Sequence, residues 1–225
     1  AGEFNAEDLI KEEQTVVALT HFGYIKRMPI DIYRSQRRGG KGITGIATRE
    51  EDFVKQIFTA STHDTILFFS NKGKLYKLRG FEIPEAGRTA RGTAIVNLLN
   101  LDAGEKISAV IPIQNFAEGK YLLMATKNGL IKKTALTEYN SARRTGLQGI
   151  TLKEDDELIT VRLTDGEDNV VLVTREGMCI TFDEKEVRPI GRVSQGVIGI
   201  RLDEGDEVIG MESVIAGGKG ATLLA

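Results

Sequence analysis

The sequence predicts an all-β, propeller-like array of about 50-residue blades, with four complete repeats and the start of a fifth. Three observations support this prediction. One glycine recurs at matching points of four segments, each segment holds three short apolar runs separated by turns, and no window of about 11 residues shows the 3.6-residue apolar period of a helix. Long helices are therefore not expected.

The repeat is defined by a turn glycine that recurs at intervals of 50, 56 and 48 residues. Three positions before it stands a hydroxyl residue, ten positions after it an apolar residue, and 17 to 19 positions after it a second glycine. The four copies comprise the turn glycines Gly23, Gly73, Gly129 and Gly177, the hydroxyl residues Thr20, Ser70, Thr126 and Thr174, the apolar residues Tyr33, Ile83, Tyr139 and Val187, and the second glycines Gly42, Gly92, Gly146 and Gly196. Because such agreement is hard to reach by chance, we interpret the segments as copies of one structural unit.

Each unit begins as a β-hairpin. A run of β-branched or aliphatic residues, such as Val16–Leu19, leads into the glycine turn, and a second short run follows it. Asn128-Gly129 is the strongest of these turns, because both residues tolerate the positive φ of a primed hairpin turn. A third apolar stretch closes each unit, at 53–58, 107–112, 158–163 and 208–211.

These runs divide the chain into blades at roughly 7–50, 51–103, 104–154 and 155–204, with a partial blade at 205–225. Residues 1–6 are interpreted as a tag or linker remnant, so that 7–225 form a single domain. Ala221–Ala225 looks like the first strand of a fifth unit. Because a single blade cannot bury both of its faces, we expect an incomplete ring with an exposed edge that could drive association.

Composition excludes several classes of protein. The chain is 41% hydrophobic and 28% charged, which is typical of a globular protein rather than a disordered one. Its apolar runs fall far below the ~18 residues of a membrane helix. A single cysteine, Cys179, excludes an internal disulfide and fits a reducing cytoplasm. No metal site is expected, because His21 and His63 lie 42 residues apart without a third ligand nearby and no EF-hand spacing is present.

The net charge is −2, yet positive charge is concentrated at matching places of the repeats. Residues 23–46 hold six basic residues against one acidic, 73–96 five against two, 129–150 four against one, and 177–200 three against three. Acidic residues collect instead in connecting loops such as 154–157 and 203–207. Since equivalent positions of a radial array line up on one rim, the sequence predicts a track of cations for a polyanion. The alternative is that turn lysines and arginines merely solvate the surface.

Duplex DNA is the expected polyanion. Without Trp and with 6% aromatic residues, the chain lacks the stacking surface of single-strand binders, and no helix is predicted that could read a major groove. Cations on a curved rim would bend the duplex, which costs on the order of 1–6 kcal/mol over 20–30 bp and makes binding steeply salt-dependent. The predicted DNA-binding residues are Lys26, Arg27, Arg37, Arg38, Lys41, Lys74, Arg79, Arg88, Arg91, Lys132, Lys133, Arg143 and Arg144.

The first repeat contains the heptapeptide Gln36-Arg37-Arg38-Gly39-Gly40-Lys41-Gly42. Its glycines allow backbone N–H groups to approach phosphate, and its three cations supply charge. It is not a Walker loop, because no Lys-Ser or Lys-Thr follows the glycines at the required spacing. The heptapeptide is identical to the gyrase A box, the signature of the family of DNA gyrase A C-terminal domains. Further segments resemble that family in order, namely 7–10, 21–26, 61–64, 124–126 and 195–201, so the resemblance covers nearly everything after residue 6.

The resemblance implies a β-pinwheel, a six-bladed propeller variant whose blades exchange strands and which wraps DNA around its perimeter. It also implies that the box helps the whole enzyme to introduce negative supercoils. The later repeats keep only a basic residue and the glycine of the box, as in Arg88 to Gly92, Arg143 to Gly146 and Arg192 to Gly196.

No catalytic residue and no cofactor are expected in this chain. Tyr33 and Tyr139 occupy the apolar repeat position and are expected to pack in the core, while the resemblance places the cleavage tyrosine in another domain and the ATPase on gyrase B. The parent is expected to be an ATP-dependent type II DNA topoisomerase, an isomerase that uses ATP and Mg through other domains. The expected partners are double-stranded DNA, the remainder of gyrase A and, through it, gyrase B, in the bacterial cytoplasm at the nucleoid and without membrane contact.

Two alternatives remain open. The corresponding domain of topoisomerase IV shares the blades but has a degenerate box, so the intact box argues against it. A propeller that binds a protein partner could use its rim charges only for solubility. DNA binding that increases with duplex length would favour wrapping, whereas a protein adaptor would ignore DNA.

Overall fold

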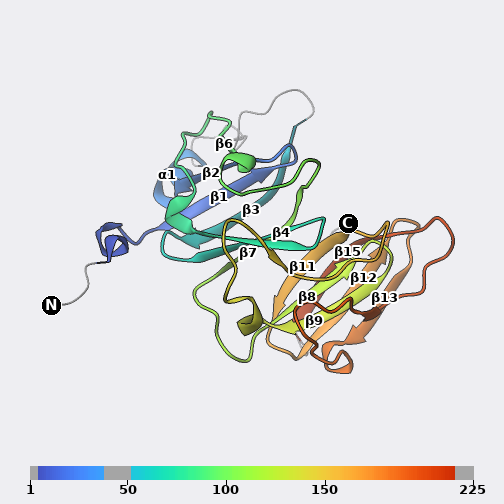
Figure 1. The fold of residues 1–225 in the computed structure, drawn as a ribbon. Coiled ribbons are helices and arrows are strands. Elements are labelled where there is room, and N and C mark those ends of the chain that lie inside the picture. The colour runs from blue at the N-terminus through green and yellow to red at the C-terminus, as the bar shows by residue number, and fades with distance from the viewer. Residues whose placement is uncertain (1–4, 38–51, 216–225) are drawn as a thin grey trace.

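The computed structural model describes residues 5–37 and 52–215. Within these residues, four small antiparallel sheets follow one another in the order of the chain (Figure 1). The sheet of β1 and β2, in blue, and the sheet of β12 and β13, in orange, lie at opposite ends of the series. The predicted all-β, propeller-like array with four complete repeats is confirmed, whereas the predicted start of a fifth repeat at Ala221–Ala225 lies outside the described residues.

Each sheet is built on a hairpin, as predicted. The turn glycines all have positive φ, between +79° and +92°. The side-chain hydroxyl three residues before each glycine accepts a hydrogen bond from the backbone N–H of the residue that follows the glycine, at 3.1 to 3.3 Å. The hairpins are β1 (Gln14–Thr20) with β2 (Tyr24–Pro29), β4 (Thr65–Ser70) with β5 (Lys74–Arg79), β8 (Tyr121–Thr126) with β9 (Leu130–Ala135), and β12 (Asp168–Thr174) with β13 (Cys179–Asp183).

A third strand pairs with the first strand of each hairpin. These strands are β3 (Val54–Ser61), β7 (Ile107–Ile113), β11 (Leu158–Thr164) and β15 (Val208–Ile215). β11 contacts both β7 and β15, and the amine of Lys55 in β3 donates to the carbonyl oxygen of Ile107 in β7 at 2.7 Å. The third strands therefore lie next to one another and line the inner side of the array.

A short strand from the following repeat completes the opposite edge of three sheets. β6 (Thr93–Ala94) pairs with β2, β10 (Leu147–Gln148) with β5, and β14 (Val197–Ile198) with β9. The strands therefore cross the predicted blade boundaries, since β3 and β6 both lie within 51–103 but belong to the sheet of β1 and β2. Among the described residues no strand pairs with the outer edge of β13, so the fourth sheet has three strands.

Short helical segments connect the strands, and one follows the second strand of each hairpin. None of them was predicted, because each is too short to show a helical period. The segments are η1 (Ala6–Leu9), α1 (Ile30–Arg37), η2 (Gly80–Glu82), η3 (Ile95–Asn97), η4 (Leu136–Tyr139) and η5 (Glu184–Glu186). In the part of the chain that the structure describes, no helix has the length and apolar character needed to cross a membrane.

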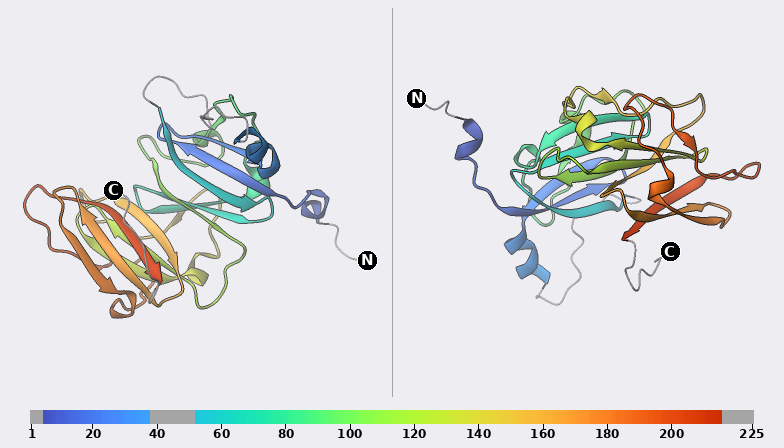
Figure 2. Two further views of the ribbon diagram at one scale, coloured as in Figure 1. Left: turned by 180° about the vertical axis from the view of Figure 1, so that it is seen from behind. Right: turned by 90° about the horizontal axis from the view of Figure 1, so that it is seen from below.

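The core consists of three apolar clusters, each between two successive sheets. Figure 2 shows the sheets in two further views. Phe68 packs toward the first sheet and Phe69 toward the third, because neighbours on a strand point to opposite faces. Both are fully buried, and burying such a side chain stabilises the fold by roughly 1.5–3 kcal/mol. Tyr139 is buried as predicted and its hydroxyl donates to the Gly149 carbonyl at 3.0 Å, whereas Tyr33 in α1 is only partly buried.

Candidate nucleic-acid interface

Three loops cross from one sheet to the sheet before it. They comprise residues 84–92, 140–146 and 188–196, and we refer to them as the crossing loops. Each follows the helical turn after a second strand and ends in β6, β10 or β14, the short strand that joins the preceding sheet. The crossing loops therefore lie along the outer edge of the sheets, opposite to the third strands.

The second glycine of the repeat lets each crossing loop approach the sheet beneath it. Gly92, Gly146 and Gly196 have φ of +93°, +98° and +94°. A Cβ atom on Gly92 would lie 2.5 Å from the carbonyl oxygen of Ile25, and one on Gly196 would lie 2.6 Å from that of Ile131. Neither the backbone conformation nor the space admits a side chain, which explains why the repeat has glycine here.

Lys26 lies beneath the first of these loops rather than on the rim. Its side chain is buried, with 2% of the residue exposed. Its amine donates to the carbonyl oxygens of Gly87, Arg88 and Ala90 at 2.9, 3.0 and 3.0 Å. Burial lowers the pKa of Lys26. The three carbonyls oppose that shift, because an ammonium offers three donors and a neutral amine only two.

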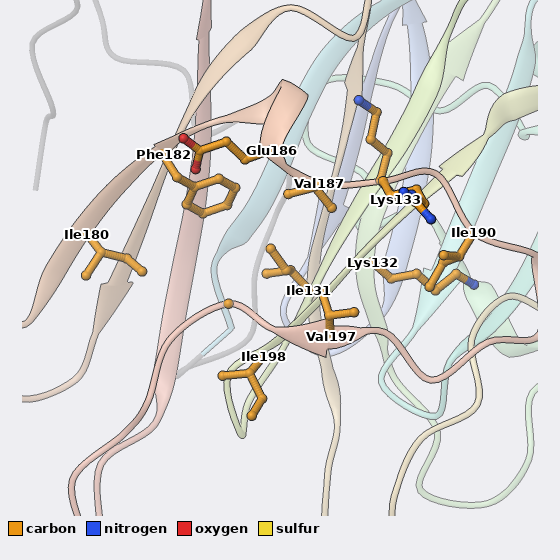
Figure 3. Close-up of a pocket in the computed structure, with 12 residues that line it drawn as sticks. Ile131, Lys132, Lys133, Ile180, Phe182, Glu186, Val187, Ile190, Val197 and Ile198 are labelled. Carbon is orange, nitrogen blue, oxygen red and sulfur yellow. The ribbon is translucent and has the colours of Figure 1, made fainter.

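Lys132 and Lys133 are also buried, and their side chains point in different directions (Figure 3). The Lys132 amine donates to the carbonyl oxygens of Gly149, at 2.6 Å, and of Arg192. Burial lowers the pKa of Lys132 to about 8. The Lys133 amine lies 3.5 Å from a carboxylate oxygen of Glu184 and 4.6 Å from the centre of the Tyr121 ring.

Both lysines border an open groove of about 440 Å³ between β9, β14 and β13. Apolar side chains cover most of its wall, and Figure 3 shows Ile131, Val187 and Val197 gathered between the lysines and Phe182. Neither lysine is a free cation on the outer edge, since both amines already have protein acceptors.

The assignment of Lys26, Lys132 and Lys133 to phosphate contact is therefore corrected. A phosphate would have to enter a buried site and displace carbonyl or carboxylate oxygens that already satisfy each amine. Their ammonium groups bind carbonyl and carboxylate oxygens of the protein itself.

Arg27 and Arg79 are also held by protein groups. The Arg27 guanidinium donates to the Ile83 carbonyl at 2.7 Å and lies 3.1 Å from the carboxylate of Glu85, with 14% of its side chain exposed. Arg79 donates to the carboxylate of Glu7 and, at 2.5 Å, to the carbonyl oxygen of His63. Both arginines tie segments together, so they are weaker candidates for DNA contact than the sequence predicts.

Lys74 and Arg144 are exposed but have carboxylate partners. Lys74 lies 2.9 Å from Asp102, which raises the pKa of the lysine and lowers that of Asp102. Arg144 pairs with Glu82. Because an exposed ion pair contributes only about 0–1 kcal/mol, a phosphate could compete for either cation.

Arg88, Arg91 and Arg143 stand on the crossing loops. Arg91 stacks over the Tyr24 ring, with its guanidinium carbon 3.8 Å from the ring centre, and donates to the Tyr24 hydroxyl. The side chains of Arg88 and Arg143 make no ion pair or hydrogen bond with any other residue in the described part of the chain. Arg88 is partly exposed and Arg143 is exposed. Among the predicted cations whose side chains the structure describes, these two are the ones without a protein partner.

The third crossing loop offers a cation that the sequence prediction left out. The balance of three basic to three acidic residues over 177–200 counts Glu184, which is fully buried. Glu184 accepts from the Thr164 hydroxyl and, at 2.9 Å, from the Asp168 N–H, in addition to facing Lys133. Arg188 is exposed, so the surface of this loop is more basic than the count indicates.

Most of the gyrase A box lies outside the described residues. Gln36 and Arg37 end α1, and nothing is described for Arg38, Gly39, Gly40, Lys41 and Gly42. The box begins in the last two residues of α1, and in the sequence it stands where the other repeats have their crossing loops. Its predicted role therefore stays a prediction that rests on its position in the repeat.

The remaining candidates for other chemistry lie apart from one another. The His21 ring stacks on Phe53 with 4.8 Å between ring centres, and Nε2 of His63 lies 2.8 Å from the carbonyl oxygen of Ile10. Cys179 is exposed at the start of β13. Within residues 5–37 and 52–215, no three His, Cys, Asp or Glu residues are grouped so that they could hold a metal ion.

Comparison with known proteins gives a consistent result. A family model described as the DNA gyrase C-terminal domain, beta-propeller, matches four successive segments, 14–61, 64–114, 120–165 and 168–215. The DNA gyrase A protein of Clostridium acetobutylicum is 54% identical over 198 residues, which cover 88% of this chain and 24% of that protein. The chain thus spans about a quarter of the length of this curated relative.

Solved structures show the same likeness. A crystal structure of the C-terminal domain of DNA topoisomerase IV superimposes with a TM-score of 0.78 at 33% identity, covering 92% of this chain and 63% of that one. A structure of a DNA gyrase A C-terminal domain superimposes with a TM-score of 0.69 at 27% identity, covering 90% and 65%.

Proposed function

This chain belongs to the DNA gyrase C-terminal domain family, and from that premise we propose that it binds duplex DNA along its crossing loops and bends it around the outer edge of the sheets. The role is one of binding: the chain holds and shapes DNA, and the bond-breaking chemistry belongs to other domains of the parent protein.

One observation carries this proposal. Loops at equivalent positions of successive sheets carry arginines along one edge of the array, of which Arg88 is partly exposed and Arg143 and Arg188 are exposed. Such a recurrence supplies phosphate contacts at intervals along a curved surface, which is what offsets the elastic cost of bending a duplex. The only α-helix among the described residues, α1, has eight residues, so phosphate contact is favoured over base reading.

The parent role follows from the same premise. We propose that the parent is DNA gyrase A, part of an ATP-dependent type II topoisomerase, which works with gyrase B and uses ATP and Mg outside this chain. The bent segment would be presented to the cleavage domain so that strand passage introduces negative supercoils. This role places the protein at the nucleoid in the bacterial cytoplasm.

The first experiment measures affinity for duplexes of increasing length. If the duplex bends around the array, affinity should rise steeply between about 20 and about 100 bp, because a short duplex reaches only one or two crossing loops. Gel-shift titrations at fixed salt measure this dependence. Affinity that does not change with length, or no binding at all, would favour the protein-interaction alternative.

The second experiment tests the box in the reassembled parent enzyme. Replacing Arg37, Arg38 and Lys41 with Ala should abolish supercoiling while leaving relaxation of supercoiled DNA largely intact, because the box is proposed to deliver the wrapped segment rather than to cleave it. The matched control is Arg175→Ala, on the turn between β12 and β13 and away from the crossing loops. Equal loss of both activities would contradict the role.

The C-terminal domain of topoisomerase IV is the second candidate, because its solved structure shares this fold. The box distinguishes the two: activity that does not depend on Arg37, Arg38 and Lys41 would favour the topoisomerase IV type.

A further inference from the structure

The third position after each turn glycine lies directly beneath a crossing loop, or beneath the place where one would lie. The four copies hold Lys26, Tyr76, Lys132 and Ile180. Two of these are buried lysines, although lysine is almost never fully buried unless its charge is satisfied. The partners of these lysines show what they do for the loops above them.

Lys26 holds the first crossing loop from below. Its three bonds reach carbonyl oxygens at three points of residues 87–90, and the carbonyl of Gly87 also accepts the N–H of Ala90 at 3.1 Å. These bonds turn three carbonyls of the loop inward, on the segment that carries Arg88. The positive charge of Lys26 thereby offsets the partial negative charge of these carbonyl oxygens on the inner side of the loop.

Lys132 connects two crossing segments at once. One of its acceptors, Gly149, follows β10 in the second sheet, and the other, Arg192, precedes β14 in the third sheet. A backbone hydrogen bond also holds the crossing loop 188–196, since the N–H of Ile190 donates to the Lys133 carbonyl at 2.8 Å. The amine therefore fixes the end of one exchanged strand and the start of the next.

Tyr76 occupies the same position but supports its loop differently. Its hydroxyl donates to the Glu105 carboxylate at 2.8 Å, so it is not available to the loop. The loop rests on the ring instead, since a Cβ on Gly146 would lie 2.9 Å from a ring carbon. The backbone bond from the Lys77 N–H to the Arg143 carbonyl, at 3.2 Å, adds to this support.

We propose that Lys26 and Lys132 are positioning residues whose ammonium groups fix the crossing loops 84–92 and 188–196 in the shape that meets DNA phosphates. They act through the loop backbone and do not touch the duplex. The inference rests on the proposed function, since it assigns the loops to DNA, but the hold on the loops is a property of the free protein and is measured without DNA.

The test is amide hydrogen exchange in the Lys26→Met variant, which keeps the length of the side chain but removes its donors. The Ala90 amide should exchange about tenfold faster or more, because its loop loses charge-assisted hydrogen bonds. Amides of β1 and the Ser194 amide of the distant loop should keep their rates. The matched control is Tyr76→Phe, which keeps the ring and should leave the exchange of the Gly146 amide unchanged.

Duplex affinity is measured on the same variants. Lys26→Met should weaken binding about as much as Arg88→Ala does, by several-fold. Unchanged exchange at Ala90 overturns the inference. Faster exchange with unchanged affinity, while Arg88→Ala weakens binding, overturns the positioning role and leaves the proposed function standing. Unchanged affinity in both variants overturns the proposed function itself.

A second variant keeps the inference testable if Lys26→Met does not fold. Lys132→Met should raise the exchange rate at Ser194 and leave that at Ala90 unchanged, because the two lysines hold different loops. Exchange that increases equally throughout the sheets would indicate a general loss of stability and would overturn a local positioning role.

Discussion

The crossing loops 84–92 and 140–146 follow the same path between sheets and each carries two arginines, yet they rest on different supports. The first lies on the ammonium of Lys26 and the second on the ring of Tyr76. The same backbone geometry can thus be held by a buried cation or by an aromatic face. A count of basic residues therefore overstates the charge that the first blade presents, since part of it serves the interior.

Each of the two loops has one arginine with a protein partner and one arginine without. In each loop one arginine has a partner, Arg91 with Tyr24 and Arg144 with Glu82. In each loop the other, Arg88 or Arg143, makes no such contact among the described residues. One available arginine per loop is a smaller but more regular pattern than the charge balance predicts.

The two loops should differ most in their tolerance of a side chain at the second glycine. Gly92→Ala should lower the free energy of unfolding by about 3 kcal/mol, because φ is positive and the new Cβ would meet the Ile25 backbone. Gly146→Ala should cost about 2 kcal/mol, because φ is equally positive there but the new Cβ would meet the Tyr76 side chain rather than backbone. Urea unfolding measures both, and equal losses would show that the loops approach the sheets alike.

A buried lysine should make stability depend on pH. The pKa of Lys132 is about 8 in the folded protein, below the ordinary value of 10.5. Between these values the unfolded chain binds the proton and the folded chain does not, so the free energy of unfolding rises with pH in that window and is constant below it. From pH 8 to 10 the wild-type protein should gain about 1–2 kcal/mol relative to Lys132→Met. Parallel pH profiles of the two proteins would mean that the amine keeps its charge.

The aromatic support predicts a smaller effect. Tyr76→Phe removes the hydroxyl that donates to Glu105 but keeps the ring beneath loop 140–146. It should lower the free energy of unfolding by about 1 kcal/mol, because one hydrogen bond to a buried carboxylate is lost. Thermal unfolding measures this loss. A decrease in duplex affinity in the same variant would mean that the hydroxyl matters to the loop after all.

The smallest effect is expected at the paired arginine. Arg144→Ala should change the free energy of unfolding by less than about 0.5 kcal/mol, because its partner Glu82 is reached across an exposed ion pair. It should also weaken duplex binding less than Arg143→Ala does. Titration of both variants at one salt concentration measures the difference, and the reverse order would show that a phosphate displaces Glu82.

Much of the fold could be predicted from the sequence because its signals recur. The turn glycines and their hydroxyl partners specify four hairpins, and the third apolar stretch of each unit forms a strand. The exchanged strands could not be predicted from periodicity, since β6, β10 and β14 have two residues each. Their only signal is the second glycine, whose positive φ becomes meaningful once the loop above the sheet is known.

The interface was harder to predict than the fold. Lysine is usually exposed, so residue type alone predicts that Lys26 and Lys132 lie at the surface. Alignment of the repeats does indicate that this position is buried, because the equivalent positions hold Tyr76 and Ile180, residue types that favour burial. The burial of Glu184 has no comparable signal in the sequence, since it depends on Thr164 and Lys133 in neighbouring strands.

The salt dependence of duplex binding tests the central claim most directly. The logarithm of the affinity should fall linearly with the logarithm of the salt concentration, and the double variant Arg88→Ala, Arg143→Ala should reduce that slope by about 2, one for each lost phosphate contact. The control Arg175→Ala should keep the wild-type slope. A double variant with an unchanged slope would contradict the claim that the crossing loops carry the DNA.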